Sequence, residues 1–290
     1  MEQRDRAYLS ILGWPRGFDA DRRVEALVVA AGMDPYLAGQ MARRETPAIV
    51  HQFDHVLRDE ILGALHGMGV LALAPSRAEM RGYARVELAR EVERFPGAEP
   101  AAFAVQQRDG GAWTFQLPDV RLVVTGTVRQ VGRVRTHAAG ASDFGLGSAA
   151  IGGADMVLAE MAWDAINDEG SGGWGSHTTR NTRAVPTADL HVMTPGGPRL
   201  VRLSGQTTRI GVVGQPHGRP SLLDRPDPSE ELARHMPGVR VDTGFERFNT
   251  PSDVEQMADS AGQGSARLNP IAFHFYSVWS ALIDMGVRGW

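Results

Sequence analysis

The chain has 290 residues, of which 42% are hydrophobic, and this length predicts about two domains. Its formal net charge of −4 provides no global attraction for nucleic acids or anionic membrane surfaces. There is no cysteine, and all 30 basic residues are arginine, which excludes disulfides, thiolate nucleophiles, cysteine-based metal sites, Schiff-base chemistry and the lysine of a P-loop.

The N-terminal residues, MEQRDRAYLS, mix acidic and basic side chains. They contain no apolar core of the length found in signal peptides. We therefore expect a cytoplasmic protein.

Residues 1–78 predict a compact module with the element order βααβαβ. Asp19 and Gly32 fit the N-cap and the C-terminal stop of its first helix, and Asp34 with Pro35 fits the start of the second. Apolar residues at helical spacing support each helix, and short apolar runs mark the strands. The expected elements are a strand at 7–14, helices at 19–31 and 34–44, a strand at 47–52, a helix at 54–68 and a strand at 69–75.

The stretch VEALVVAAGMDPYLAGQMARRETPAIV, followed by a helix, the turn GMGV and a strand, resembles the C-terminal domain of the bacterial ribosomal stalk protein. The resemblance covers about the first 75 residues and rests on element order, helix lengths and the positions of small residues and prolines. It implies the fold of that domain and, by analogy, a docking or adaptor role. Tyr36 and Gly39 stand where that family carries lysines on the helix that meets translation factors, so the ribosomal role itself is not expected.

Three polar residues of the expected third helix, His55, Asp59 and His66, share one face because steps of four and seven residues nearly realign. Imidazole and carboxylate groups are common metal ligands, so this set is a candidate metal site. The face lies opposite Leu57 and Ile61, which makes a solvated helix face the competing interpretation.

Residues 79–102 are predicted to be a connecting helix followed by a linker. The run VELAREVER is charged, and FPGAEP is rich in turn-forming residues. The second domain then spans residues 103–290.

This second domain is predicted to be rich in β-strands. An Asp-Gly turn joins AFAVQQ and AWTFQL into a hairpin, and a Pro-Gly-Gly turn joins ADLHVM and PRLVRLS into another. Such a meander fits a small barrel or sandwich, reminiscent of pleckstrin-homology-like barrels, with C-terminal helices over an open end or edge. The fold class expected for the whole chain is α+β.

Residues 138–186 interrupt the β pattern as a glycine-rich insertion around one expected helix. At its start, FGLGSAAIGG contains a G-x-G-x-x-A run formed by Gly145, Gly147 and Ala150. The preceding residues, THAAGASD, are small and polar rather than β-branched, and they do not predict a strand. We therefore interpret the run as a flexible start of the insertion rather than a dinucleotide-binding turn.

The later part of the insertion, GSGGWGSHTTRNTRA, carries the candidate ligand-binding residues. Trp174 offers an aromatic plate, and His177 offers a hydrogen-bonding imidazole. Arg180 and Arg183 add two guanidinium groups, so the set suits a phosphate, carboxylate or peptide ligand. A loop with solvated arginines and a half-buried tryptophan is the competing interpretation.

The last helix is predicted at 270–285, with one apolar stripe formed by Ile271, Phe275, Val278 and Leu282. A second apolar stripe lies beside it, and the segment is too short and too polar for a membrane anchor. We interpret it as a buried core helix. An interface with a second copy or a partner, through the same four residues, is the alternative.

The sequence contains no G-x-S-x-G nucleophile elbow, no H-E-x-x-H motif and no EF-hand loop. We therefore predict a non-enzymatic binding or regulatory protein of adaptor type that uses no cofactor and recognises a protein or an anionic ligand. The alternatives are a hydrolase that uses His and Asp or a histidine-bound metal, and a structural protein that assembles through the last helix.

Overall fold

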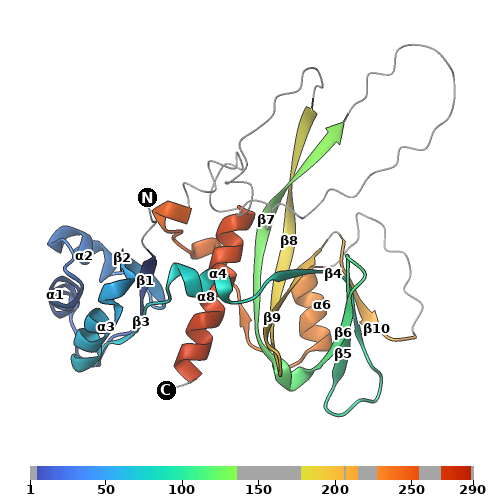
Figure 1. Cartoon of the computed structure of the whole chain (residues 1–290), viewed down its shortest axis with the longest axis horizontal. Coiled ribbons are helices and arrows are strands. Elements are labelled where there is room, and N and C mark those ends of the chain that lie inside the picture. Colours follow the sequence, from blue (N-terminus) through green and yellow to red (C-terminus); the bar gives the residue numbers. More distant parts are fainter. Residues whose placement is uncertain (1–4, 136–177, 206, 215–226, 255–268, 289–290) are drawn as a thin grey trace.

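The computed structural model describes residues 5–135, 178–205, 207–214, 227–254 and 269–288. A three-stranded sheet and an eight-stranded sheet lie on either side of one C-terminal helix (Figure 1). The predicted α+β class is therefore confirmed. No helix within these ranges is long and apolar enough to cross a membrane.

The N-terminal module has the predicted order, with an added 3₁₀ turn before its third helix. Asp19 caps the first helix through its side chain, and Gly32 closes it with a φ of 61°. Asp34 caps the second by accepting hydrogen bonds from the backbone N–H groups of Tyr36 and Leu37. The elements are β1 (Arg6–Gly13), α1 (Ala20–Ala31), α2 (Pro35–Met41), β2 (Ala48–Asp54), η1 (His55–Leu57), α3 (Arg58–Gly67) and β3 (Leu71–Leu73).

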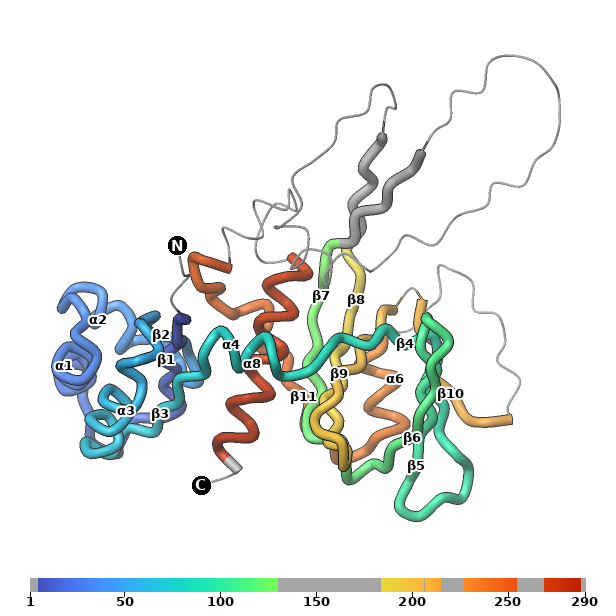
Figure 2. The backbone as a smooth tube through the Cα atoms, viewed as in Figure 1, coloured from blue at the N-terminus to red at the C-terminus, as the bar shows by residue number. Residues whose placement is uncertain are grey.

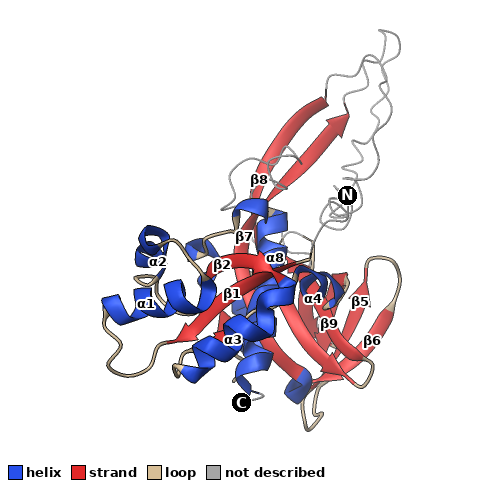
Figure 3. Cartoon of the chain, turned by 60° about the vertical axis from the view of Figure 1, so that its left-hand side comes forward, coloured by secondary structure: helices blue, strands red, loops and turns tan. Residues whose placement is uncertain are grey.

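Strand β1 is the middle strand of the three-stranded sheet, and both of its faces are buried. Leu9 and Ile11 pack in one core with Leu27 of α1 and Leu65 of α3. Figure 3 shows α1 and α3 gathered on one side of this sheet. Because side chains alternate along a strand, Tyr8 belongs to the other face and joins a second core. Two-sided burial explains why AYLSIL is apolar almost throughout.

Residues 79–102 do not form the predicted connecting helix and linker. Helix α4 (Arg77–Gly82) is short and starts with a capping box. The charged run VELAREVER is strand β4 (Val86–Arg94), in which Ala89 and Val92 are buried. Pairing with β5, β9 and β10 overrides the helix propensity of its glutamates and arginines. The second sheet therefore begins inside the segment predicted to link the two domains.

The eight-stranded sheet is open, so the predicted barrel does not close. Its order is β11-β7-β8-β9-β4-β5-β6, with β10 paired to β4. Among the described strands the two ends of this order do not pair with each other, so no pleckstrin-homology-like barrel closes. Parallel pairing of β4 with β9 and β10, which no local sequence pattern encodes, joins the hairpins into one sheet. Besides β4, the strands are β5 (Ala102–Gln107), β6 (Ala112–Gln116), β7 (Val120–Arg135), β8 (Thr178–Thr194), β9 (Gly197–Ser204), β10 (Arg209–Val212) and β11 (Val241–Asp242).

Strands β7 and β8 form a long hairpin that takes up the ends of the predicted insertion. Their pairing extends as far as Arg135 opposite Thr178. Residues 178–186 therefore belong to a strand and not to a loop, in keeping with the β-branched residues of TTRNTRAV. The rest of the insertion, with its G-x-G-x-x-A run, lies within 136–177, outside the described residues.

Helix α8 (Pro270–Arg288) is the buried helix predicted from the sequence, and it lies between the two sheets (Figure 2). On the side of the N-terminal module, Trp279 Nε1 donates a hydrogen bond to Ser10 Oγ at 2.8 Å. The rings of Phe275 and Tyr8 meet edge to face, with their centroids 4.9 Å apart. On the other side, α8 packs on β7. Helix α6 (Pro228–His235) packs on β8.

The structure gives no support to the alternative role of the last helix, as an interface between copies. Of its four predicted contact residues, Ile271, Phe275 and Val278 are only 1–4% exposed, and Leu282 packs against the same core. Strands β1 and β7 of the same chain already cover these side chains. The apolar stripe therefore packs within the chain's own core, and it no longer serves as an argument for assembly through this helix.

Gly126 of β7 has no room for a side chain against this core. An added Cβ would lie 2.7 Å from Phe245 Cδ1 and 3.0 Å from Phe273 Cε2, and both rings are buried. We expect Gly126→Ala to lower the free energy of unfolding by about 1–3 kcal/mol, because the rings must shift. Urea denaturation measures this change.

Gly39→Ala is the matched control. A Cβ added to Gly39 meets nothing within 4 Å, and the residue lies inside α2. This substitution should raise the free energy of unfolding by about 0.5–1 kcal/mol. Equal effects of the two substitutions would contradict the close packing of Gly126.

Candidate functional site

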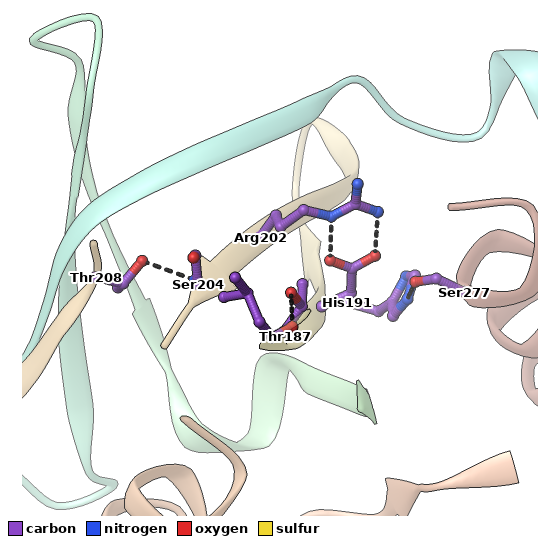
Figure 4. Close-up of polar contacts among 8 residues, drawn as sticks. Thr187, His191, Arg202, Ser204, Thr208 and Ser277 are labelled. Carbon is purple, nitrogen blue, oxygen red and sulfur yellow. Dashed lines mark hydrogen bonds and ion pairs between the residues drawn. The ribbon is translucent and has the colours of Figure 1, made fainter. Parts of the chain in front are cut away.

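The side of β8 and β9 that faces α8 carries a row of buried polar side chains (Figure 4). Arg202 donates from Nε to Asp189 Oδ1 and from Nη2 to Asp189 Oδ2, each at 2.7 Å. Burial raises the pKa of the Asp189 carboxyl, but the charge and hydrogen bonds of Arg202 outweigh this and hold it below its ordinary value. The two residues therefore form an ionised pair in the interior.

His191 connects this row to α8. Its Nδ1 lies 3.1 Å from Tyr83 Oη, and its Nε2 lies 2.9 Å from Ser277 Oγ. Burial lowers the pKa of His191 to about 4. The imidazole is therefore neutral at pH 7, with one ring nitrogen donating and the other accepting.

Ser277, His191 and Asp189 are the residue types of a catalytic triad, but their arrangement differs from one. The ring nitrogen of His191 that points away from Ser277 contacts Tyr83, and Asp189 is paired with Arg202. All three triad-type residues are 0–1% exposed, so no substrate reaches the Ser277 hydroxyl in this arrangement. We interpret the group as a structural network.

A cavity of about 560 Å³ lies where the N-terminal module meets β11 and α8. We call it the inter-module cavity. Its walls come from the residues around the start of β2, from β11, from the 3₁₀ turn η4 (Gly244–Arg247) and from α8. It is large enough for a small organic ligand.

Three arginines line the inter-module cavity, and they differ in how their charge is balanced. Arg240 donates to the carboxylate of Asp284 at 2.5 Å. Arg44 donates only to the backbone carbonyl of Ile49, at 3.3 Å, and burial lowers the pKa of its guanidinium. Arg247 is exposed and makes no ion pair or hydrogen bond with any described residue. Arg44 and Arg247 therefore bring two cationic groups without a carboxylate partner to one cavity.

The carboxylate of Asp242, which also lines this cavity, accepts three hydrogen bonds from neighbouring residues. Its Oδ1 accepts from Tyr276 Oη at 2.7 Å and from Gly244 N at 2.8 Å, and its Oδ2 accepts from Ser280 Oγ. Burial, followed by the charge of Asp242, raises the pKa of Tyr276, which keeps this hydroxyl protonated as a donor. Exposed Glu45 is the other acidic lining residue.

Aromatic rings form the deeper part of the inter-module cavity. The ring of Phe248 lies 4.7 Å from that of Tyr276 and 5.2 Å from that of Trp279, measured between centroids. Tyr276 and Trp279 are buried, whereas Phe248 is partly exposed. A planar group entering the cavity would therefore meet Phe248 first.

The residues predicted to bind a ligand in the insertion lie partly outside the described part of the chain. Trp174 and His177 lie outside the described residues. The backbone of Arg180 and Arg183 belongs to β8, so these two residues extend from a strand rather than from the predicted loop.

The predicted metal site at His55, Asp59 and His66 is wrong. Within the described ranges, no group of three or more His, Cys, Asp or Glu side chains is placed to hold a metal ion. Asp54 caps η1 and not the third helix, so His55 lies in the 3₁₀ turn before α3. The helical spacing that was to align His55 with Asp59 and His66 therefore does not apply. His66 Nε2 lies 2.9 Å from the backbone oxygen of Ala72.

The sequence analysis missed Arg44, Arg247 and Phe248. They come from two segments separated by about 200 residues, and neither segment contains a recognisable motif. The only local signal was FERF, in which an arginine stands between aromatic residues that follow a turn.

No family model, curated protein or solved structure matches this chain. The resemblance of the N-terminal module to the ribosomal stalk domain therefore stays a prediction from sequence.

The buried histidines predict a pH dependence of stability. The pKa of His191 falls from an ordinary 6.5 to about 4, so between these values the unfolded chain takes up a proton that the folded chain does not. Stability contributed by neutral His191 is therefore complete above pH 7 and is lost as the pH falls, by up to about 3 kcal/mol below pH 4. His274 and Asp189 act in the same direction, because their pKa values are also lowered.

Urea denaturation between pH 7.5 and pH 4.5 measures this effect. We expect His191→Gln to reduce the slope of the unfolding free energy against pH by up to about 1.4 kcal/mol per pH unit, the value for one proton. His55→Gln, at the partly exposed η1, is the control and should keep the wild-type slope. A wild-type slope in the His191 variant would show that this histidine is not the buried neutral group.

Proposed function

We propose that this protein is a non-enzymatic binding protein that holds an anionic ligand in the inter-module cavity. The observation that carries the proposal is Arg247, a cation at the cavity wall with no ion pair or hydrogen bond to any described residue. Arg44 supports it, because its guanidinium reaches only a backbone carbonyl.

Guanidinium groups bind carboxylates and phosphates through parallel N–H donors, and such charge-assisted hydrogen bonds are the strong ones. The inter-module cavity supplies two of these groups from different parts of the chain, Arg44 before β2 and Arg247 at the end of η4. The carboxylate of Asp242 accepts from Tyr276, Ser280 and Gly244, and no arginine of the cavity is paired with it in the described residues. An anionic group is therefore the best electrostatic match.

The shape of the cavity favours a small ligand over an added peptide strand. The edge of β2 borders the cavity, but Pro47 has no N–H to donate, and Arg44 occupies the outward carbonyl of Ile49. Strand addition needs a free row of such groups. Phe248 instead offers a partly exposed ring surface, which suits a planar group attached to the anion.

The same lining favours binding over hydrolysis by a histidine-dependent mechanism. Its described residues include no serine or histidine, and the chain has no cysteine or lysine. A hydrolase that uses a histidine or a histidine-bound metal would need such a group at this site. The predicted adaptor role of the N-terminal module is compatible with the proposal, because that module forms one wall of the cavity.

Phenyl phosphate and inorganic phosphate are the probes for this proposal, with affinity measured by isothermal titration calorimetry. We expect Arg247→Gln to weaken phenyl phosphate binding by about 10- to 100-fold, the effect of losing hydrogen bonds to a charged group. Phe248→Leu should reduce the preference for phenyl phosphate over inorganic phosphate and leave the affinity for inorganic phosphate near its wild-type value.

Arg209→Gln is the matched control, because Arg209 is an exposed arginine on β10 that does not line the cavity. It should bind both probes as the wild type does. Equal losses in the Arg209 and Arg247 variants, or no binding of either probe by the wild type, would refute the proposed site.

A further inference from the structure

A second cavity, of about 450 Å³, lies next to the inter-module cavity. Thr243 and Arg247 line both, so these two residues mark the border between them. We call the second one the threonine cavity. Its remaining walls come from β7, from β8, from η4 and from the start of α6.

Residues with polar side chains form nearly all of the lining of the threonine cavity. Apart from Gly126, every lining side chain carries a hydroxyl, a carboxylate or a guanidinium group. The hydroxyls include those of Thr125, Thr127 and Ser229, and the carboxylates are Asp227 and Glu246. The inter-module cavity differs in that aromatic and aliphatic side chains, such as those of Phe248 and Ile49, stand among its polar lining residues. The two halves of the joint space therefore favour different chemical groups.

The edge of β7 adds backbone groups to this surface. Strand β11 pairs with β7 only at Val123 and Val124. Among the described strands, β7 has no neighbour on this edge from Thr125 onward, where the threonine cavity begins. The backbone N–H and C=O groups that point away from β8 there therefore have no strand partner within the described part of the chain.

The two carboxylates retain acceptor capacity. Asp227 uses Oδ1 to accept from Ser229 N and Ser229 Oγ, each at 2.8 Å, and no described residue donates to its Oδ2. Glu246 is exposed and has no hydrogen-bond or ion-pair partner among the described residues. Carboxylate oxygens accept hydrogen bonds from hydroxyl groups, and threonine hydroxyls both donate and accept.

Charge sets the orientation of a ligand that enters both cavities. The threonine cavity has two carboxylates and one arginine, so it repels an anion except at Arg247. An uncharged group rich in hydroxyls, in contrast, finds acceptors and donors on all sides there. An apolar group would instead strip water from these polar side chains without replacing its hydrogen bonds.

On this basis we infer that the ligand is an anionic sugar: its phosphate or carboxylate lies at Arg247, and its hydroxylated ring occupies the threonine cavity. The inference rests on the proposed function, because it uses the same arginine as the anion site. It adds the class of ligand and assigns the recognition of hydroxyl groups to Thr127 and Glu246.

Titration calorimetry with inorganic phosphate, glucose and glucose 6-phosphate tests the inference, and glucuronate distinguishes a carboxylate from a phosphate as the preferred anion. We expect glucose 6-phosphate to bind at least about tenfold more tightly than inorganic phosphate, because several added hydrogen bonds contribute. The double variant Thr127→Val/Glu246→Gln should lose this tenfold advantage. It should bind inorganic phosphate at least as tightly as the wild type, because it removes one of the carboxylates that repel an anion. Glucuronate tests the other anion. If the wild type binds glucuronate and the double variant weakens this binding, the result supports the inference with a carboxylate as the anion.

Thr114→Val/Glu60→Gln is the matched control, since both residues are exposed and lie on β6 and α3, away from the two cavities. It should bind all probes as the wild type does. If the double variant Thr127→Val/Glu246→Gln fails to fold, the single variant Glu246→Gln, at an exposed position, must still reduce the advantage of glucose 6-phosphate.

The two proposals fail in different ways. Equal affinity of the wild type for glucose 6-phosphate and inorganic phosphate, with binding lost in Arg247→Gln, overturns the inference and leaves the anion site intact. Absence of binding for phosphate, phenyl phosphate and the anionic sugars overturns the proposed function together with the inference.

Discussion

Helix α8 is shared by both halves of the molecule, and the position of every other element relative to the site depends on it. One side of the helix meets the N-terminal module through the Trp279–Ser10 hydrogen bond and the Phe275–Tyr8 ring contact. Its other side lies on the eight-stranded sheet. The inter-module cavity exists because α8, β11 and the start of β2 converge without filling the space between them. A shift of α8 would therefore separate Arg44 from the other cavity residues.

The sheet surface under α8 is unusual, because its central residues are polar. A buried ion pair such as Asp189–Arg202 contributes little net stability, since the cost of removing both charges from water offsets their attraction. We attribute to this row a role in specificity. Apolar side chains alone would allow α8 several similar positions, whereas the hydrogen bond between His191 and Ser277 is satisfied in one. The row thus fixes the helix on which the cavity depends.

Sequence reasoning succeeded where local chemistry decides the structure and failed where pairing between distant segments does. Asp34 and Gly32 predicted the helix ends of the N-terminal module, because capping acts within a few residues. Strand β4 has helix-favouring residues and becomes a strand only through its three neighbours. The polar residues of β8 alternate with apolar ones, a pattern that is typical of a strand with one solvated face. In the structure, α8 covers this polar face. Arg44 and Arg247 meet through the same long-range packing, so no motif could have paired them.

The position of the site between two parts of the chain has a thermodynamic consequence. A ligand that contacts Arg44 and Arg247 together binds only the arrangement in which the N-terminal module is docked. By linkage, such a ligand stabilises that arrangement, by about 2.7 kcal/mol when its free concentration is 100 times its Kd. Without a ligand, the Trp279–Ser10 hydrogen bond and the Phe275–Tyr8 ring contact still join the module to α8, so the docked state does not depend on occupancy. Ligand binding would therefore tighten an interface that α8 has already formed, and it would couple the predicted docking role of the N-terminal module to the state of the cavity.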